Sequence, residues 1–178
     1  MAIDENPILV QSVADRVTHA ATLDATNEEA LRVADMASFD MVVVAIGANS
    51  RSGNGAVAGH VRIYSWNGST WAQKGIDIDG EAASDQSGYS VSMPDSNTVA
   101  LGAILNDGNG TNTGHVRIYY WNGSIWMQKG TDIDGEASGD YSGCSVSMAD
   151  SNTVTIGTYN NQENGIFNGH VRVYSWNG

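Results

Sequence analysis

The sequence is poor in cysteine, proline and basic residues, and two of these shortages exclude classes of structure or partner. Its single cysteine, Cys144, rules out a disulfide within the chain and is expected to be a small apolar residue of a strand. Eight lysine and arginine residues stand against twenty aspartate and glutamate residues, for a formal net charge of -12. Nucleic acids and anionic membrane surfaces attract positive charge, so neither is expected as a partner.

Long apolar runs are also missing. No apolar stretch is long enough to cross a membrane, so membrane insertion is not expected. The opening residues, "MAIDENPILV", lack the basic start and apolar core of a signal peptide. We therefore expect the chain as given to be soluble and to carry no targeting signal.

Glycine and aromatic residues are what the chain has in quantity. Its 178 residues include 21 glycines, seven tyrosines and five tryptophans, with only two prolines. Short strands separated by tight turns have this composition, and the chain is long enough to bury one core. The composition predicts an all-β domain.

An internal repeat organises the sequence. Gly59, Gly114 and Gly169 stand 55 residues apart, and each opens a nearly identical stretch, "GHVRIYSWNG", "GHVRIYYWNG" or "GHVRVYSWNG". A fainter copy lies upstream, since "VAIGA" at 44–48 precedes "VALGA" at 99–103 by the same distance. A fixed period of this length is typical of repeat architectures.

Each unit contains the pattern of four short strands. In "HVRIYSW" apolar residues alternate, as in a strand, and Asn67-Gly68 predicts a two-residue hairpin with both residues at positive φ. The same holds at Asn122-Gly123, which would place Trp126 opposite Tyr119. A second hairpin is expected at "PDSN", where Asp95 suits an Asx turn.

The pattern divides the chain into an N-terminal segment, 1–30, and a repeat domain, 31–178, with units of about 31–79, 80–134 and 135–178. Its third unit stops after three strands. Residues 14–24 lie in register with the missing strand and could supply it, although capping signals near Pro7 and Thr26 indicate helix. Alternatively, the chain is an excerpt of a longer array, or two copies form a homodimer that completes a six-unit ring. A β-trefoil is the second candidate fold.

At "GYSVSMPDSNTVALGA" followed by "GHVRIY" the chain resembles the FG-GAP repeat family, the blades of integrin-like β-propellers. The resemblance implies a β-propeller-like array of three four-stranded units, and an extracellular or cell-surface interaction module. The calcium loop of the family is shortened here to "MPDSNT", a departure that affects Asp95 and Asp150.

Two acidic loops, "DIDGEAASD" and "DIDGEASGD", are the chemically distinctive segments. Carboxylates spaced around a glycine turn are suited to a hard cation such as calcium, and calcium is expected rather than zinc because all these ligands are oxygens. The alternative is that they are turn and solvation residues. The candidate ligands are Asp77, Asp79, Glu81, Asp85, Asp132, Asp134, Glu136 and Asp140.

Three histidines, His60, His115 and His170, occupy one position of the repeat and are each followed by an arginine two residues later. They could meet as a metal site. The sequence favours a simpler interpretation, in which each opens a strand and is repeated because the unit was duplicated.

Equivalent residues in every unit favour binding over catalysis. We expect a non-catalytic extracellular interaction or adhesion module, whose loops, stiffened by calcium, contact a protein or glycan. The alternatives are a carbohydrate-active enzyme that uses acidic loop residues, and a structural spacer in a larger repeat protein.

Overall fold

The computed structural model describes residues 2–4, 20–22, 42–48, 50, 54–161 and 168–178. The chain divides into two compact parts, which differ from the sequence repeats. One is residues 1–42 with 66–70, and the other is residues 43–65 with 71–178. All regular elements among the described residues are strands, which confirms the all-β prediction. No helix in this part of the chain is long and apolar enough to cross a membrane.

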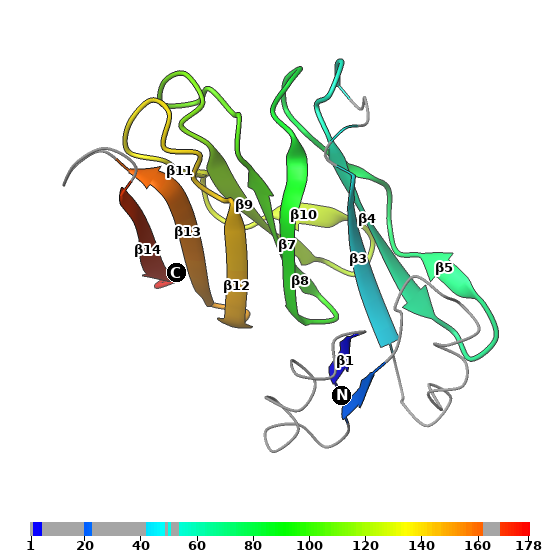
Figure 1. Ribbon diagram of the computed structural model, residues 1–178. Coiled ribbons are helices and arrows are strands. Elements are labelled where there is room, and N and C mark those ends of the chain that lie inside the picture. The colour runs from blue at the N-terminus through cyan, green and yellow to red at the C-terminus, as the bar shows by residue number, and fades with distance from the viewer. Residues whose placement is uncertain (1, 5–19, 23–41, 49, 51–53, 162–167) are drawn as a thin grey trace. The chain divides into compact units, whose positions relative to one another are not determined.

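Three sheets follow one another along the repeat region (Figure 1), and each has the strand order of the repeat. The first sheet consists of β3 (Val42–Ala48), β4 (His60–Trp66) and β5 (Trp71–Gln73), with β6 (Ile78–Asp79) paired to β4. The second consists of β7 (Ser87–Asp95), β8 (Thr98–Ala103), β9 (His115–Trp121) and β10 (Trp126–Gln128), with β11 (Ile133–Asp134) paired to β9. The third consists of β12 (Ser145–Asp150), β13 (Thr153–Asn161) and β14 (Asn168–Ser175).

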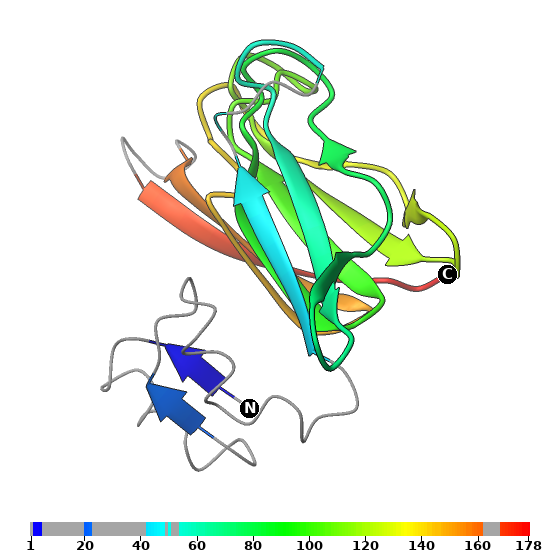
Figure 2. The same cartoon turned by 90° about the vertical axis from the view of Figure 1, so that its right-hand side faces the viewer.

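The sheets are open, and Figure 2 shows β3 and β4 side by side in the first of them. None of the described sheets closes into a barrel, as a β-trefoil would require. The predicted β-propeller-like array of four-stranded units is therefore confirmed, and the second sheet contains all four predicted strands.

Two more strands lie near the N-terminus. β1 (Ala2–Asp4) and β2 (Ala20–Thr22) form a parallel pair of their own. Residues 14–24 were one candidate for the missing strand of the third unit, with helix as the alternative; of these the structure describes only 20–22, which pair with β1. The helix predicted nearby lies outside the described residues.

Among the described residues, the core consists of two apolar layers, one between each pair of consecutive sheets. The first layer packs Val61 and Ile63 of β4 against Val99 and Leu101 of β8, and Trp126 joins them. The second layer contains Ala100, Val116, Met148, Val154 and Ile156. Both faces of the second sheet are thus buried, because β8 alternates its side chains between the two layers.

Backbone contacts also join consecutive sheets. Gly114 forms an isolated parallel bridge with Ser142, and the Ser142 N–H donates to the Thr113 carbonyl over 2.8 Å. Gly59 and Ser87 form the equivalent bridge one unit earlier. The spacing between sheets is therefore fixed by main chain as well as by side chains.

The predicted hairpin between β9 and β10 is present, but its turn differs from the prediction. Gly123 has φ of 102°, whereas Asn122 is not among the residues with positive φ. The Asn122 side-chain oxygen instead accepts hydrogen bonds from the backbone N–H groups of Ser124 and Ile125, each over 2.9 Å. The longer loop shifts the register, so Trp126 lies opposite Trp121 and Tyr119 opposite Gln128.

Replacing Asn122 with alanine should therefore destabilise the protein through loss of this Asx cap. The two N–H groups are exposed and can bond to water, so we expect the free energy of unfolding to fall by only about 1 kcal/mol. Urea denaturation of Asn122→Ala beside the wild type measures this. A Ser124→Ala control, which keeps both backbone bonds, should remain within about 0.5 kcal/mol of the wild type.

Candidate metal centre

The eight acidic residues proposed as ligands do not form one cluster in each loop. Of the first loop, Asp77 and Asp79 lie with His60, whereas Glu81 lies with residues of the second sheet. Among the described residues, groups of acidic, histidine and cysteine side chains close enough to hold one ion occur at two places, His60 with Asp77 and Asp79, and Glu81 with His115 and Asp132.

Asp85 and Asp140 are buried turn residues. One oxygen of Asp85 accepts the Ala82 N–H over 2.9 Å and the Asn106 amide over 3.1 Å. The matching oxygen of Asp140 accepts two backbone N–H groups in the same way. Both carboxylates thus hold the loop that carries the other acids.

The cluster at His60 is already neutralised by an arginine. Arg62 donates to both oxygens of Asp77 over 2.9 to 3.0 Å, and Gln73 donates to the same carboxylate over 2.8 Å. These bonds lower the pKa of Asp77, the bond from Arg62 most of all. A cation would have to displace Arg62 to bind there.

The cluster at His115 is different because its histidine is buried and has no hydrogen-bond partner. His115 is 1 % exposed, and neither ring nitrogen makes a hydrogen bond. Its Nδ1 lies 3.5 Å from a carboxylate oxygen of Asp132, and Glu81 from the loop after β6 completes the group, with all three donor atoms within 4.8 Å of one another. A buried polar group that has no partner is costly, so each such group calls for an explanation.

Burial and charge keep this imidazole neutral. Burial, and then the positive charge of Arg117, lower the pKa of His115 to about 4, while Asp132 and Asp85 act in the opposite direction. Burial also raises the pKa of Glu81. At neutral pH His115 therefore has a nitrogen lone pair free to bind a metal ion.

Strand pairing brings these residues together. β11 runs antiparallel to β9, with Asp134 opposite His115 and Ile133 opposite Val116, and Asp132 comes directly before this paired stretch. Gln128 donates to the other oxygen of Asp132 over 2.6 Å and fixes its carboxylate. Asp134 does not belong to the cluster. Its pKa is raised first by burial and then by the charge of Asp132.

Arg117 holds Glu81 against the second sheet. Its guanidinium lies 3.3 Å from a Glu81 oxygen and donates to the Asp79 carbonyl over 2.9 Å. Arg172 and Glu136 form the equivalent ion pair one unit later. The acid at this position therefore links consecutive sheets, and at Glu81 it also faces a histidine and a second carboxylate.

One nitrogen and two oxygen donors fit a transition metal such as zinc. Zinc binds imidazole and carboxylate at about 2.0 to 2.2 Å, so two of its ligands lie about 3.4 Å apart in a tetrahedral site. The separation of 3.5 Å between His115 and Asp132 is close to this value. The prediction of calcium assumed ligands that were all oxygen, whereas the folded chain adds an imidazole.

The turns at Asp95 and Asp150, which the resemblance relates to a calcium loop, do not fit a calcium ion. Asp95 accepts the Asn97 N–H over 2.6 Å, and Asp150 accepts the Asn152 N–H over 2.7 Å. Neither aspartate belongs to a candidate ion cluster among the described residues. Both are Asx-turn residues, as predicted from "PDSN".

Sequence reasoning considered His115 only as one of three repeated histidines and did not group it with Glu81 and Asp132. The signal was the repeated pairing of "GHV" with "DID", because the second segment returns along the first and places an aspartate 17 residues after the histidine. Glu81 had no such signal, since only the packing of one sheet on the next brings it to the site.

Two family models match the chain. The model of the TrkA-N domain matches residues 1–63, of which the described stretches 42–48 and 60–63 lie in strands of the first sheet. No curated protein matches the chain. The model of the FG-GAP repeat matches residues 73–119, from the end of β5 through most of β9, and this stretch contains Glu81 and His115. This part of the chain, which joins the first two sheets, is an FG-GAP repeat, as its sequence had indicated.

Proposed function

We propose that the chain is a non-catalytic interaction module of the cell surface or extracellular space, and that a zinc ion held by Glu81, His115 and Asp132 stiffens its acidic loops. The loops bind a protein or glycan partner. FG-GAP repeats are interaction modules, and one such repeat spans the junction where these three residues meet.

The observation that carries the metal proposal is the unpartnered ring of His115. A buried imidazole without a hydrogen bond destabilises the fold, and a metal ion would satisfy it together with the two carboxylates. Because Glu81 comes from the loop after β6, a strand of the first sheet, and the other two ligands come from the second sheet, the ion would tie two sheets together.

The repeat also explains why we propose binding rather than catalysis. The residues around the site recur as pairs, Glu81 with Glu136 and Arg117 with Arg172, and serve the same contact in each unit. An enzyme would need a nucleophile or acid confined to one place.

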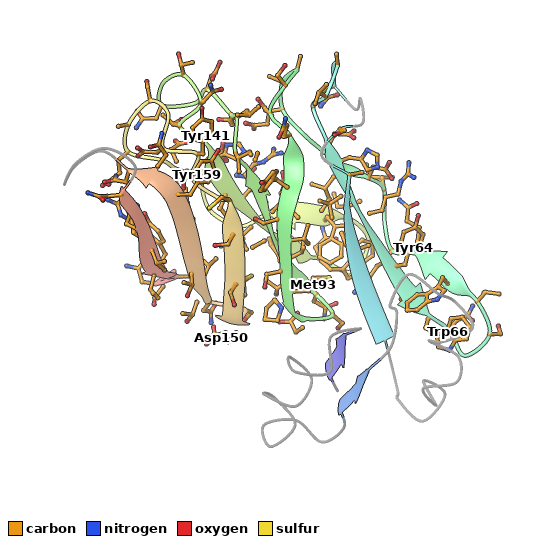
Figure 3. All side chains as sticks on the ribbon, viewed as in Figure 1. Tyr64, Trp66, Met93, Tyr141, Asp150 and Tyr159 are labelled. Atoms are coloured by element: carbon orange, nitrogen blue, oxygen red, sulfur yellow. The ribbon has the colours of Figure 1, made fainter. Side chains whose placement is uncertain are left out.

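Exposed tyrosines offer a contact surface of the kind that interaction modules use. Tyr141 and Tyr159 stack with their ring centres 5.0 Å apart and their planes within 5° (Figure 3), and Tyr159 is 51 % exposed. Tyr89 is exposed as well. Tyrosine is enriched at protein interfaces because one end of its ring is apolar and the other polar.

Calorimetric titration with zinc and then with calcium tests the metal site. We expect zinc to bind with one site per chain and calcium more weakly. At a hundredfold excess over Kd, zinc should raise the melting temperature by about 5 °C or more relative to a chelator-treated sample. Hydrogen exchange should slow in residues 80–86 and 131–136.

Matched variants separate the binding of zinc by Glu81 from its ion pair with Arg117 across the two sheets. Glu81→Gln should weaken zinc binding at least about tenfold. Glu136→Gln loses the equivalent contact to Arg172 and should bind zinc like the wild type. Identical melting curves with zinc and chelator, or equal losses in the two variants, would contradict the proposal.

A further inference from the structure

Tyr141 and Tyr159 bring two phenol rings into contact beside the third sheet (Figure 3). Their planes are parallel to within 5°, and flat rings in contact lie about 3.5 to 4.0 Å apart face to face. The 5.0 Å between the ring centres therefore means that the rings are offset, so that edge carbons of one ring lie over the other. Tyr159 belongs to β13 and is 51 % exposed, which leaves the pair open to reagents in solution.

This pair departs from the repeat. The residues 55 positions earlier are Gln86 and Ile104, of which Ile104 is buried, so the preceding unit has no phenol at either place. The backbone holds Tyr141 firmly, since its φ is 55° and its N–H donates to the Asn112 carbonyl over 3.2 Å. Gln86 has nearly the same φ, 58°, so this turn belongs to the repeat, whereas the two stacked rings do not.

Tyr89 of β7 is a third phenol in this region. Burial raises the pKa of Tyr159, and Tyr141 and then Tyr89 raise it further, so both phenols lie near it. Tyr89 is 45 % exposed. Among the ring contacts of the described residues, however, Tyr159 stacks with Tyr141. The geometry thus selects one partner for Tyr159 from the two phenols nearby.

We propose that Tyr141 and Tyr159 are a site of oxidative cross-linking, at which hydrogen peroxide and a haem peroxidase join the two rings as dityrosine. Each phenol gives one hydrogen atom to the oxidant and becomes a phenoxyl radical, while one peroxide molecule becomes two water molecules. The radicals couple through ring carbons next to the C–O bonds. One C–C bond forms, and the protons on these two carbons move to the phenol oxygens. Because the rings already touch, coupling within the chain outpaces coupling between chains.

The cross-link joins the loop between β11 and β12 to β13. A disulfide within the chain is excluded because Cys144 is its single cysteine, so dityrosine supplies a covalent brace by other chemistry. Neither tyrosine belongs to the zinc cluster, so the cross-link does not depend on the proposed metal site. Closing the loop between residues 141 and 159 restricts the unfolded chain, as a disulfide does, and should raise the melting temperature by about 5 °C.

The test treats the full chain, freed of zinc beforehand by a chelator, with hydrogen peroxide and a haem peroxidase. We expect a monomeric product that is lighter by two hydrogen atoms and has the blue fluorescence of dityrosine. Mass spectrometry of its peptides should locate the link between Tyr141 and Tyr159. A melting curve beside that of the untreated chain then measures the stabilisation.

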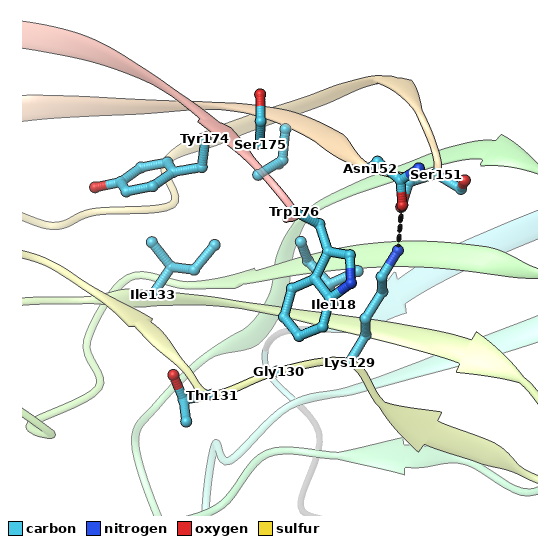
Figure 4. Close-up of a pocket in the computed structure, with 11 residues that line it drawn as sticks. Ile118, Lys129, Gly130, Thr131, Ile133, Ser151, Asn152, Tyr174, Ser175 and Trp176 are labelled. Atoms are coloured by element: carbon cyan, nitrogen blue, oxygen red, sulfur yellow. Dashed lines mark hydrogen bonds between the residues drawn. The ribbon is translucent and has the colours of Figure 1, made fainter. Parts of the chain in front are cut away.

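Phenylalanine variants show which phenols react. Tyr141→Phe and Tyr159→Phe each keep a ring but remove the O–H that is oxidised, so both should lose the link within the chain. Tyr174→Phe is the matched control, because Tyr174 is half-buried like Tyr141 and lines a pocket whose other described walls include no tyrosine (Figure 4). This variant should cross-link like the wild type.

Four outcomes would overturn the proposal. They are a link from Tyr159 to Tyr89, cross-links formed only between chains, an undiminished yield in Tyr141→Phe, and a cross-linked chain that melts like the untreated one.

Discussion

Trp126→Ala is expected to lower the free energy of unfolding by about 4 kcal/mol, because it leaves a large cavity between the first two sheets. The side chain is 8 % exposed and contacts the layer formed by residues of β4 and β8. Loss of the indole also leaves the Lys74 carbonyl without its donor and the Lys74 ammonium without one of its two rings.

Urea denaturation measures this loss. A second variant separates the contribution of the indole N–H from that of the ring, and a third serves as a control. Trp126→Phe keeps an apolar ring but removes the N–H, so we expect a loss of about 1 to 2 kcal/mol. Ile125→Ala changes a neighbour that is 51 % exposed and should cost less than about 1 kcal/mol. A loss for Trp126→Ala as small as that for Ile125→Ala would contradict the described packing.

Gly114→Ala is expected to be almost as damaging, at about 3 kcal/mol. Gly114 has φ of 69°, a conformation that costs a residue with Cβ about 1 to 2 kcal/mol. In addition, its Cβ would overlap the carbonyl oxygen of Ser142, to which the glycine is bridged. Backbone atoms cannot move aside cheaply, so the second and third sheets would have to separate.

Gly123→Ala is the matched control for this variant. Gly123 has φ of 102°, and a Cβ there would meet nothing within 4 Å. This variant therefore measures the conformational cost alone, about 1 to 2 kcal/mol. Equal losses for Gly114→Ala and Gly123→Ala would contradict the close contact between the second and third sheets at Gly114.

The repeat made the fold predictable, because identical patterns in register had to form identical strands. The turn at Asn122 was less predictable. Asn-Gly suits a two-residue loop, but the Asn122 side chain can also cap Ser124 and Ile125, and this local alternative shifted the partner of Trp126 from Tyr119 to Trp121.

The candidate site was predictable only in its acidic half. Asp132 stands out in the sequence because it belongs to a cluster of acids around a glycine, and Glu81 stands out for the same reason. Their meeting depends on how one sheet packs on the next, which the spacing of residues along the sequence does not specify. The ring of His115 became informative only when its burial and its missing partners were known.

The most direct test of the metal-stiffened junction is ¹⁵N NMR of the histidine side chains during titration with zinc. We predict that the ring resonances of His115 change on addition of one equivalent of zinc, that the change is lost in Glu81→Gln, and that His60 and His170 are unaffected. Unchanged His115 resonances at saturating zinc, or a response confined to another histidine, would contradict the account.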